Sequence, residues 1–253
     1  AELVGFSISY MDNHGFYCPL GHNNDADKNI PFDKAIKMLK ELFEHKELTV
    51  VGQNFKYDMN VVKKYSINFK TSIEDTMLMS YVLNSGGKHD LGTLSSKFLD
   101  HEAISYEDVV GKGKDQITFA DVDIQKAVTY ACEDSDLTLL LYGKLKSKLL
   151  KDKRLYDVYR SIEIKLMLII AEMEYLGVSI DNKELDKQSN DLKKRIDKIE
   201  KQIYSISGRE FNISSPKQIQ EIFYDELKLP ILKKTPKGQP STNEDVMTQL
   251  AEN

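Results

Sequence analysis

A short, continuous apolar run that leads directly into a helical pattern is the feature that most constrains the fold. Residues 48–52 (LTVVG) have the pattern of a strand that is buried on both faces. A helical pattern over residues 55–64 follows at once, with Asn54 as its expected N-cap. A strand buried on both faces needs helices on both sides of its sheet, so the sequence predicts an α/β protein.

The residues around this unit extend the same pattern. Residues 3–10 and 15–20 are rich in β-branched and aromatic side chains and flank a turn cluster, which predicts a β-hairpin. Apolar residues at helical spacing dominate most of the stretch up to residue 150. Helices are expected at residues 31–46, 73–83 and 91–99, with one long helix or a closely spaced pair at residues 124–149.

The character of the sequence changes beyond about residue 155. A strongly apolar helix is expected at residues 162–175 and ends at Gly177, after which Asp181 can cap a highly charged helix that runs to about residue 206. We therefore place a domain boundary between residues 150 and 160. Two capping boxes predict further helix starts: Ser215 with Gln218, and Ser241 with Glu244.

Composition excludes several classes of protein. The chain of 253 residues has a net charge of −5, and its first 150 residues carry 17 basic and 22 acidic side chains, so it is not a globally basic nucleic-acid binder. A local basic strip or a metal-neutralised acidic cleft stays possible. Cys18 and Cys132 are far apart and no zinc spacing occurs, so neither a disulfide framework nor a structural zinc is indicated. The longest apolar run, at residues 166–171, is too short to span a membrane.

Two segments could carry chemistry. Asn54 and Asp58 are four residues apart, as are Tyr130 and Asp134, so each pair can share one face of a helix. Carboxylates near the ends of buried strands suit divalent cations such as Mg²⁺ or Mn²⁺. The structural alternative stays open, because an aspartate in a first turn commonly stabilises the helix dipole and such a tyrosine commonly packs in the core.

These segments resemble a known family. The sequence GQNFKYD at residues 52–58 and YACEDSDLT at residues 130–138, with GKGKDQITF between them, are similar to the 3′→5′ exonuclease domain of the DNA polymerase I family, family A, of bacteria. Later segments, FNISSPKQIQEIF and LKKTPKGQPSTNEDV, are similar to the part that opens the polymerase domain and builds its thumb. The resemblance implies an exonuclease domain at residues 1–155 and a helical start of the polymerase domain at residues 156–253.

The resemblance also implies a chemistry. Asp58 and Asp134 would be metal ligands, for Mg²⁺ or Mn²⁺, in a two-metal site that hydrolyses the 3′-terminal phosphodiester of DNA. Tyr130 would position the attacking water. The fold would be a ribonuclease H-like mixed sheet flanked by helices, followed by the helical segment.

The same resemblance implies contacts with DNA. Gln53 and Asn54 match substrate-side residues, and Tyr106 stands where the family has an aromatic ring that packs on the terminal nucleotide. The expected partners are a single-stranded 3′ end and, at the thumb, duplex DNA, with no membrane and no obligate protein partner. The resemblance implies the bacterial cytosol or nucleoid as the location. Phosphate contacts are expected from Lys233, Lys234 and Lys237.

One departure from the family affects the expected activity. The first exonuclease motif, an Asp-x-Glu on a strand that lies between the strands at residues 3–10 and 48–52, is not among these 253 residues. The palm and fingers of the polymerase are also not among them. The fragment is therefore expected to lack half of the metal ligands and to be inactive by itself, whereas the parent protein would be an active enzyme in DNA replication and repair.

Three other functions were weighed. A ribonuclease D-type RNA exonuclease has the same motif chemistry, but the segment at residues 209–245 argues against it. A catalytically lapsed DNA-binding scaffold is opposed by the intact Asp58, Tyr130 and Asp134. The third alternative is a helical adaptor without a nucleic-acid role.

Five further acidic or histidine residues receive structural interpretations. Helix-start or capping roles are expected for Asp75, His89 and Asp90, the histidine also packing against its neighbours. Glu133 and Asp136 share the segment of Asp134, but helical spacing turns them to other faces, so solvent or helix-end roles are expected for both.

Overall fold

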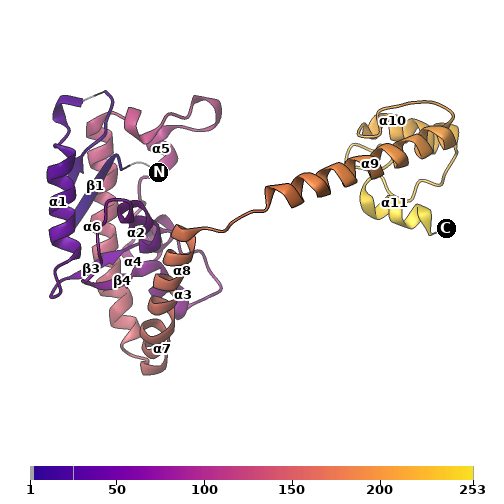
Figure 1. Ribbon diagram of the computed structural model, residues 1–253. Coiled ribbons are helices and arrows are strands. Elements are labelled where there is room, and N and C mark those ends of the chain that lie inside the picture. The colour runs from indigo at the N-terminus through magenta and orange to yellow at the C-terminus, as the bar shows by residue number, and fades with distance from the viewer. Residues whose placement is uncertain (1–2, 25, 253) are drawn as a thin grey trace. The chain divides into compact units, whose positions relative to one another are not determined.

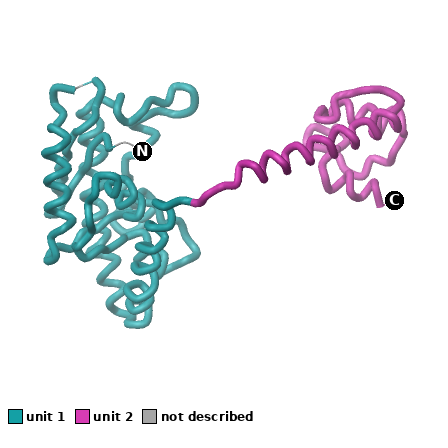
Figure 2. Tube along the Cα trace, in the orientation of Figure 1, with its two compact units in different colours: residues 1–177 teal, residues 178–253 magenta. Residues whose placement is uncertain are grey.

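The computed structural model of the chain describes residues 3–24 and 26–252. Its contacts divide it into two compact units, Ala1–Gly177 and Val178–Asn253, which are coloured teal and magenta in Figure 2. All named strands of the described residues lie in the first unit, and the second unit is built from helices and loops. Compactness thus places a division after Gly177, whereas the functional boundary between residues 155 and 156 stays a prediction.

The predicted β-hairpin is confirmed, and it packs between two helices of the first unit. Strands β1 (Gly5–Met11) and β2 (His14–Pro19) pair in antiparallel register, with Phe6 opposite Cys18. They lie between α1 (Phe32–Phe43) and α6 (Ile124–Leu149) (Figure 1). Helix α6 also shows that residues 124–149 form one continuous helix and not a pair of helices.

Gly15 allows the hairpin to approach α6 closely. A Cβ atom added at Gly15 would lie 2.6 Å from Cβ of Cys132, closer than real side-chain contacts. Glycine has no Cβ, so it can occupy a position where the backbone of one element touches another. A glycine at this position thus allows the hairpin and α6 to pack at this short distance.

A second, parallel pair of strands forms the other side of the unit. Strand β3 (Thr49–Gly52) pairs with β4 (Ser72–Asp75), and the helices α2 (Phe55–Lys63) and α3 (Thr76–Leu83) follow them directly. The expectation of one helix over residues 73–83 is wrong at its start, because Ser72–Asp75 is a strand that pairs with β3. In the part of the chain that the structure describes, the strands form two separate two-stranded sheets, not one mixed sheet.

The remaining helices of the first unit cover these sheets. Helices α3 and α4 pack against α6, and α8 packs against α2 and β4. A π-helical segment, Tyr159–Glu163, joins α7 to α8. The bounds are α4 Leu91–Leu99, α5 Tyr106–Val110, α7 Lys153–Val158 and α8 Ile164–Leu176, with short 3₁₀ turns at Ala26–Lys28, Gly113–Asp115 and Phe119–Asp121.

The main core lies where α6 meets the helices around β3 and β4. Leu141, Leu145 and Leu149 recur every four residues on one face of α6, and all three are fully buried. They belong to one cluster with Phe55 of α2 and Ile73 of β4, among other apolar residues. Burial of apolar side chains on one stripe of α6 is the main stabilisation that this arrangement provides.

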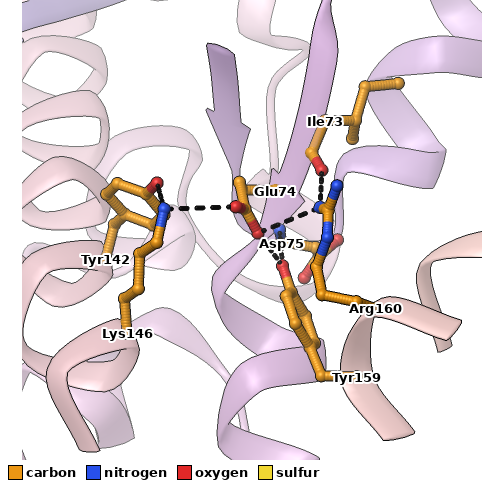
Figure 3. Close-up of polar contacts among 7 residues, drawn as sticks. All are labelled: Ile73, Glu74, Asp75, Tyr142, Lys146, Tyr159 and Arg160. Carbon is orange, nitrogen blue, oxygen red and sulfur yellow. Dashed lines mark hydrogen bonds and ion pairs between the residues drawn. The ribbon is translucent and has the colours of Figure 1, made fainter. Parts of the chain in front are cut away.

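A buried glutamate connects β4 to two helical segments (Figure 3). Glu74 is 4% exposed, and its Oε2 accepts a hydrogen bond of 2.6 Å from the hydroxyl of Tyr159. Nζ of Lys146 lies 3.4 Å from Oε1, and Nη1 of Arg160 lies 3.5 Å from Oε2. The Tyr159 hydroxyl also accepts a bond of 2.9 Å from the backbone N–H of Asp75. A buried carboxylate is tolerated because these groups compensate its charge.

Two predicted helix caps of the second unit are confirmed. Asp181 accepts hydrogen bonds from the backbone N–H groups of Lys183 and Glu184, at 3.0 and 3.1 Å. Ser215 accepts from the N–H of Gln218 at 3.5 Å, while the side chain of Gln218 bonds elsewhere, so this cap is only half of a capping box. The helices of this unit are α9 Asn182–Ser207, α10 Pro216–Gln220, a π-helical segment Glu221–Glu226 and α11 Glu244–Ala251.

The predicted cap at Ser241 is wrong. The N-cap of α11 is Asn243, which accepts from the N–H of Val246 at 3.2 Å. Ser241 instead donates its backbone N–H to the carbonyl of Lys233 at 2.8 Å, so it belongs to the preceding loop. Among the helices described here, none is both long and apolar enough to cross a bilayer.

Replacing Tyr159 by Phe should destabilise the protein by about 2–3 kcal/mol, because both the buried charge of Glu74 and the buried N–H of Asp75 lose a partner. Urea unfolding followed by circular dichroism measures this change. Tyr156→Phe, a half-buried tyrosine on α7, is the matched control and should cost no more than about 0.5 kcal/mol. Equal costs for the two variants would contradict the role assigned to Tyr159.

Candidate active site

The carboxyl ends of β3 and β4 meet at a buried aspartate. Asp75 is 1% exposed; its Oδ2 accepts from the N–H of Phe55 at 2.7 Å and its Oδ1 from the N–H of Leu78 at 3.0 Å. One carboxylate therefore caps both α2 and α3. Its predicted role as a helix-start residue is confirmed, and it extends to a second helix that the sequence did not indicate.

Asn54 occupies the N-cap position of α2 but does not cap the helix with its side chain. Its backbone lies in the left-handed region, with φ 57° and ψ 47°, a conformation that asparagine tolerates better than most residues. The predicted side-chain cap is wrong, because Asp75 already holds the first turn of the helix. Asn54 is exposed, and its role as a substrate contact stays a prediction.

Asp58 lies in the first turn of α2, the helix whose start is capped by Asp75. Asp58 is an exposed residue. Loss of hydration by its carboxyl group, followed by the negative charge of Asp75, raises its pKa to about 7. A carboxyl group held near neutrality by its surroundings would gain from a bound cation, so Asp58 has the electrostatics that a metal ligand needs.

Tyr130 and Asp134 lie one turn apart on α6, as the four-residue spacing predicted. Burial raises the pKa of Asp134 to about 6; a hydrogen bond from the Tyr130 hydroxyl lowers it, and the charge of Glu133 raises it. The pKa of Tyr130 is raised by burial and then by the charge of Asp134, so its hydroxyl remains protonated at neutral pH. The pair thus presents a phenol O–H donor beside a carboxylate.

Two aromatic rings lie beside Tyr130. The ring centroid of Tyr106, at the start of α5, lies 6.3 Å from that of Tyr130 and 6.2 Å from that of Phe119. The centroids of Phe119 and Tyr130 are 6.1 Å apart. Tyr106 is 47% exposed, so one part of its ring is open to a ligand. The structure thus brings two predicted site residues together and adds Phe119, whose only sequence signal was its place in the segment GKGKDQITF.

Gln53 is committed to bonds within the protein. Its Nε2 donates to the carbonyl of His89 at 2.7 Å, and its Oε1 accepts from Oγ1 of Thr76 at 2.5 Å. The side chain therefore links the end of β3 to the start of α3 and to the loop before α4. A direct substrate contact by Gln53 stays a prediction.

His89 and Asp90 have the structural roles that the sequence indicated. Asp90 caps α4 by accepting from the N–H of Thr93 at 2.9 Å. Nδ1 of His89 lies 2.9 Å from Oγ of Ser80, and its ring packs edge-on against Tyr81.

Glu133 and Asp136 do more than the sequence predicted. Glu133 accepts from the backbone N–H of Ile104 at 2.8 Å, and Asp136 accepts from the N–H of Asn13 at 2.7 Å. The expectation of solvent or helix-end roles is therefore wrong, because each carboxylate holds a segment distant in sequence against α6.

Each predicted metal ligand has charged or polar neighbours of its own. Asp58 lies near Asp75, and Asp134 lies beside Tyr130 and Glu133. Within residues 3–24 and 26–252, no set of three or more His, Cys, Asp and Glu side chains is arranged to hold a metal ion. The convergence of Asp58 and Asp134 on one metal site stays a prediction.

The three lysines of the second unit lie in an exposed loop. Lys233, Lys234 and Lys237 are all exposed. A turn that includes Gly238 at φ 79° closes the loop, with its N–H bonded to the carbonyl of Thr235 at 2.8 Å. The loop therefore presents its positive charges to solvent, which is compatible with the predicted phosphate contacts without testing them.

Comparison with known proteins gives consistent matches for both units. A family described as 3′-5′ exonuclease matches residues 1–150, and one described as DNA polymerase family A matches residues 182–253. DNA polymerase I of Pseudomonas aeruginosa is 40% identical over 256 residues, covering 100% of this chain and 28% of that protein. DNA polymerase I of Rhizobium leguminosarum is 40% identical over 270 residues, covering 99% and 26%.

A solved structure has a similar fold. It is described as the POL domain of Pol1 from M. smegmatis in complex with DNA primer-template and dNTP. It is 22% identical, has a TM-score of 0.64, and covers 94% of this chain and 36% of its own. The chain spans less than a third of the length of the relatives named above.

Asp58→Asn should make the protein more stable at pH 7.5 but change little at pH 4.5. Because the pKa of Asp58 is raised from an ordinary value near about 3.9 to about 7, the folded state binds more protons than the unfolded state between these values. The free energy of unfolding therefore falls as the pH rises through this window, and Asn removes that loss. Denaturant midpoints at both pH values, in the presence of EDTA, test this. The same pH dependence in both proteins would contradict it.

Proposed function

Because the chain belongs to the 3′-5′ exonuclease family of family A DNA polymerases, we propose that it is the proofreading part of a bacterial-type DNA polymerase I together with the start of its polymerase domain. The proposed reaction is hydrolysis of the 3′-terminal phosphodiester of DNA. Its place would be the replication and repair of chromosomal DNA, in the cytosol or nucleoid.

The pair of Tyr130 and Asp134 is the observation that carries the nuclease proposal. A phenol and a carboxylate one turn apart on α6, with the ring of Tyr106 beside the phenol, lie within the residues that match the exonuclease family. In the proposed reaction the Tyr130 hydroxyl holds the attacking water in line with the phosphorus. The exposed part of Tyr106 stacks on the terminal base. Such stacking works with any of the four bases, because every base has a flat face.

The family implies a divalent metal, and the two candidate carboxylates are ligands of a suitable chemical type. Asp58 and Asp134 carry raised pKa values and are oxygen donors, the ligands that Mg²⁺ and Mn²⁺ prefer. They do not suffice in number, since the described residues hold no complete metal-binding set. A bound metal would supply positive charge at the cleaved phosphate. The residues named would provide part of its ligands.

We also propose that a further strand of the full-length protein joins the two sheets. Among the residues described, β1 pairs only with β2 and β3 only with β4, yet α6 packs against both β1 and β3. A strand between them would pair both free edges and complete a ribonuclease H-like mixed sheet. Carrying the Asp-x-Glu of the first exonuclease motif, it would supply the missing carboxylates. The chain alone would then be inactive.

The second unit is proposed to be the beginning of the thumb. The match of residues 182–253 to DNA polymerase family A supports this, and it does not favour a ribonuclease D-type enzyme. The loop with Lys233, Lys234 and Lys237 would contact the phosphates of duplex DNA.

In the full-length protein, Asp134→Ala should abolish removal of a 3′-terminal nucleotide, and Tyr130→Phe should reduce its rate by about 10- to 100-fold, the range for loss of a residue that orients a metal-bound group. Tyr142→Phe on the same helix is the matched control and should leave the rate unchanged. Single-turnover digestion of a 5′-labelled single strand measures the rate, and retained DNA synthesis shows that each variant folds. Full nuclease activity in Asp134→Ala would overturn the proposed function.

The three loop lysines should contribute to the salt dependence of duplex binding. Each phosphate contact adds about −0.9 to the slope of log affinity against log salt. The variant of the full-length protein with Lys233, Lys234 and Lys237 changed to Ala should therefore lose about two to three units of slope. Fluorescence anisotropy with labelled duplex measures it. The matched control changes three exposed lysines of the first unit: Lys34, Lys37 and Lys46. If log affinity falls with log salt equally steeply in both triple variants, the loop lysines do not contact DNA.

A further inference from the structure

Glu133 is the residue of α6 that lies directly before Asp134, and both of its carboxylate oxygens bind a distant segment. Oε1 lies 2.8 Å from Nε2 of His101, and Oε2 accepts from the backbone N–H of Ile104 at 2.8 Å. Its side chain is only 19% exposed. Glu133 therefore ties α6 to the connection between α4 and α5.

This tie acts close to Tyr106. Ser105, the next residue after Ile104, forms a capping box with Asp108, in which each side chain bonds the backbone N–H of the other. Tyr106 is the first residue of α5. Ile104 is thus held by Glu133 and Ser105 by the cap, so the backbone that enters Tyr106 is fixed by these bonds.

A second carboxylate of α6 makes a similar tie that does not reach Tyr106. Oδ1 of Asp136 accepts from the N–H of Asn13, in the turn between β1 and β2. Within one turn of α6, Glu133 and Asp136 therefore hold flanking segments, while Asp134 is left beside Tyr130. The two ties differ in what they hold, which makes Asp136 a matched control for Glu133.

We infer that Glu133 is a positioning residue that holds Tyr106 against Tyr130, so that the exposed part of the Tyr106 ring can stack on the terminal base of a single-stranded nucleic acid. This inference rests on the proposed nuclease function. Loss of the tie frees the segment before α5 and weakens stacking, whereas Tyr130 and Asp134 stay in place on α6. The effect is therefore expected in substrate binding and not in the chemical step.

Steady-state digestion of oligothymidylate by the full-length protein tests the inference. Glu133→Ala should raise KM about tenfold, the order that loss of one base–aromatic stack produces, and change kcat less than about twofold. Glu133→Gln removes the same charge but keeps an oxygen that can accept from Ile104, so it should restore most of the binding. Asp136→Ala should leave KM unchanged. A fall in kcat without a change in KM for Glu133→Ala would overturn the inference.

The combination with Tyr106 shows through which residue Glu133 acts. Tyr106→Ala should raise KM by a similar factor, and the double variant should be no worse than Tyr106→Ala alone, since the tie has nothing left to position. Additive losses in the double variant would show that Glu133 acts on something else.

Hydrogen–deuterium exchange on the chain itself separates the inference from the proposed function. Glu133→Ala should speed exchange at residues 101–106, and Asp136→Ala should not, because the two carboxylates hold different segments. Unchanged exchange at Ile104 in Glu133→Ala would overturn the tie even if the protein is a nuclease. If the two variants show this exchange pattern but the wild-type full-length protein digests no DNA, the function is refuted and the tie stays in place.

Discussion

Two neighbouring acids at the end of β4 hold the first unit together. Because successive side chains of a strand point in opposite directions, Glu74 and Asp75 serve different partners. Asp75 caps α2 and α3, and Glu74 binds Tyr159, Lys146 and Arg160. Asp75 thus joins β4 to two helix starts. Glu74 joins it to α6 and to the segment between α7 and α8, as Figure 3 shows.

The cost of burying these acids explains why their surroundings are so specific. A buried carboxylate without partners loses far more hydration than packing returns, so each oxygen needs a donor. Asp75 receives its donors from the free N–H groups of two helix starts, whose dipoles also favour a negative charge. The position of α2, and with it that of Asp58, therefore depends on Asp75.

The second organising element is α6, which carries its acids in three directions. Glu133 holds the segment before α5, Asp136 holds the hairpin turn, and Asp134 lies beside Tyr130. The same helix buries Leu141 and Leu145 in the core further along. One rigid helix thus sets both the packing of the unit and the arrangement of the candidate site, which couples the stability of the fold to the geometry of the site.

Much of this could be predicted from the sequence, because the signals are local. The hairpin, the strand at β3, the helical pattern of α6 and the cap at Asp181 follow from periodicity and turn chemistry within a few residues. The four-residue spacing of Tyr130 and Asp134 likewise fixes their common helix face before any tertiary contact forms. Their assignment to a nuclease came from resemblance to a family. The comparisons confirm the family, and the roles of the two residues stay predictions.

What the sequence could not determine depends on partners far along the chain. The residues Ser72–Asp75 look like a helix start, and only pairing with β3, together with Tyr159 and Arg160, makes a strand that ends in two buried acids stable. The cap of α2 was assigned to Asn54, whereas Asp75, twenty residues later in the chain, takes it. Local pattern thus determined most of the elements, with β4 as the exception. Long-range donors, which alone can compensate a buried charge, decided how those elements meet.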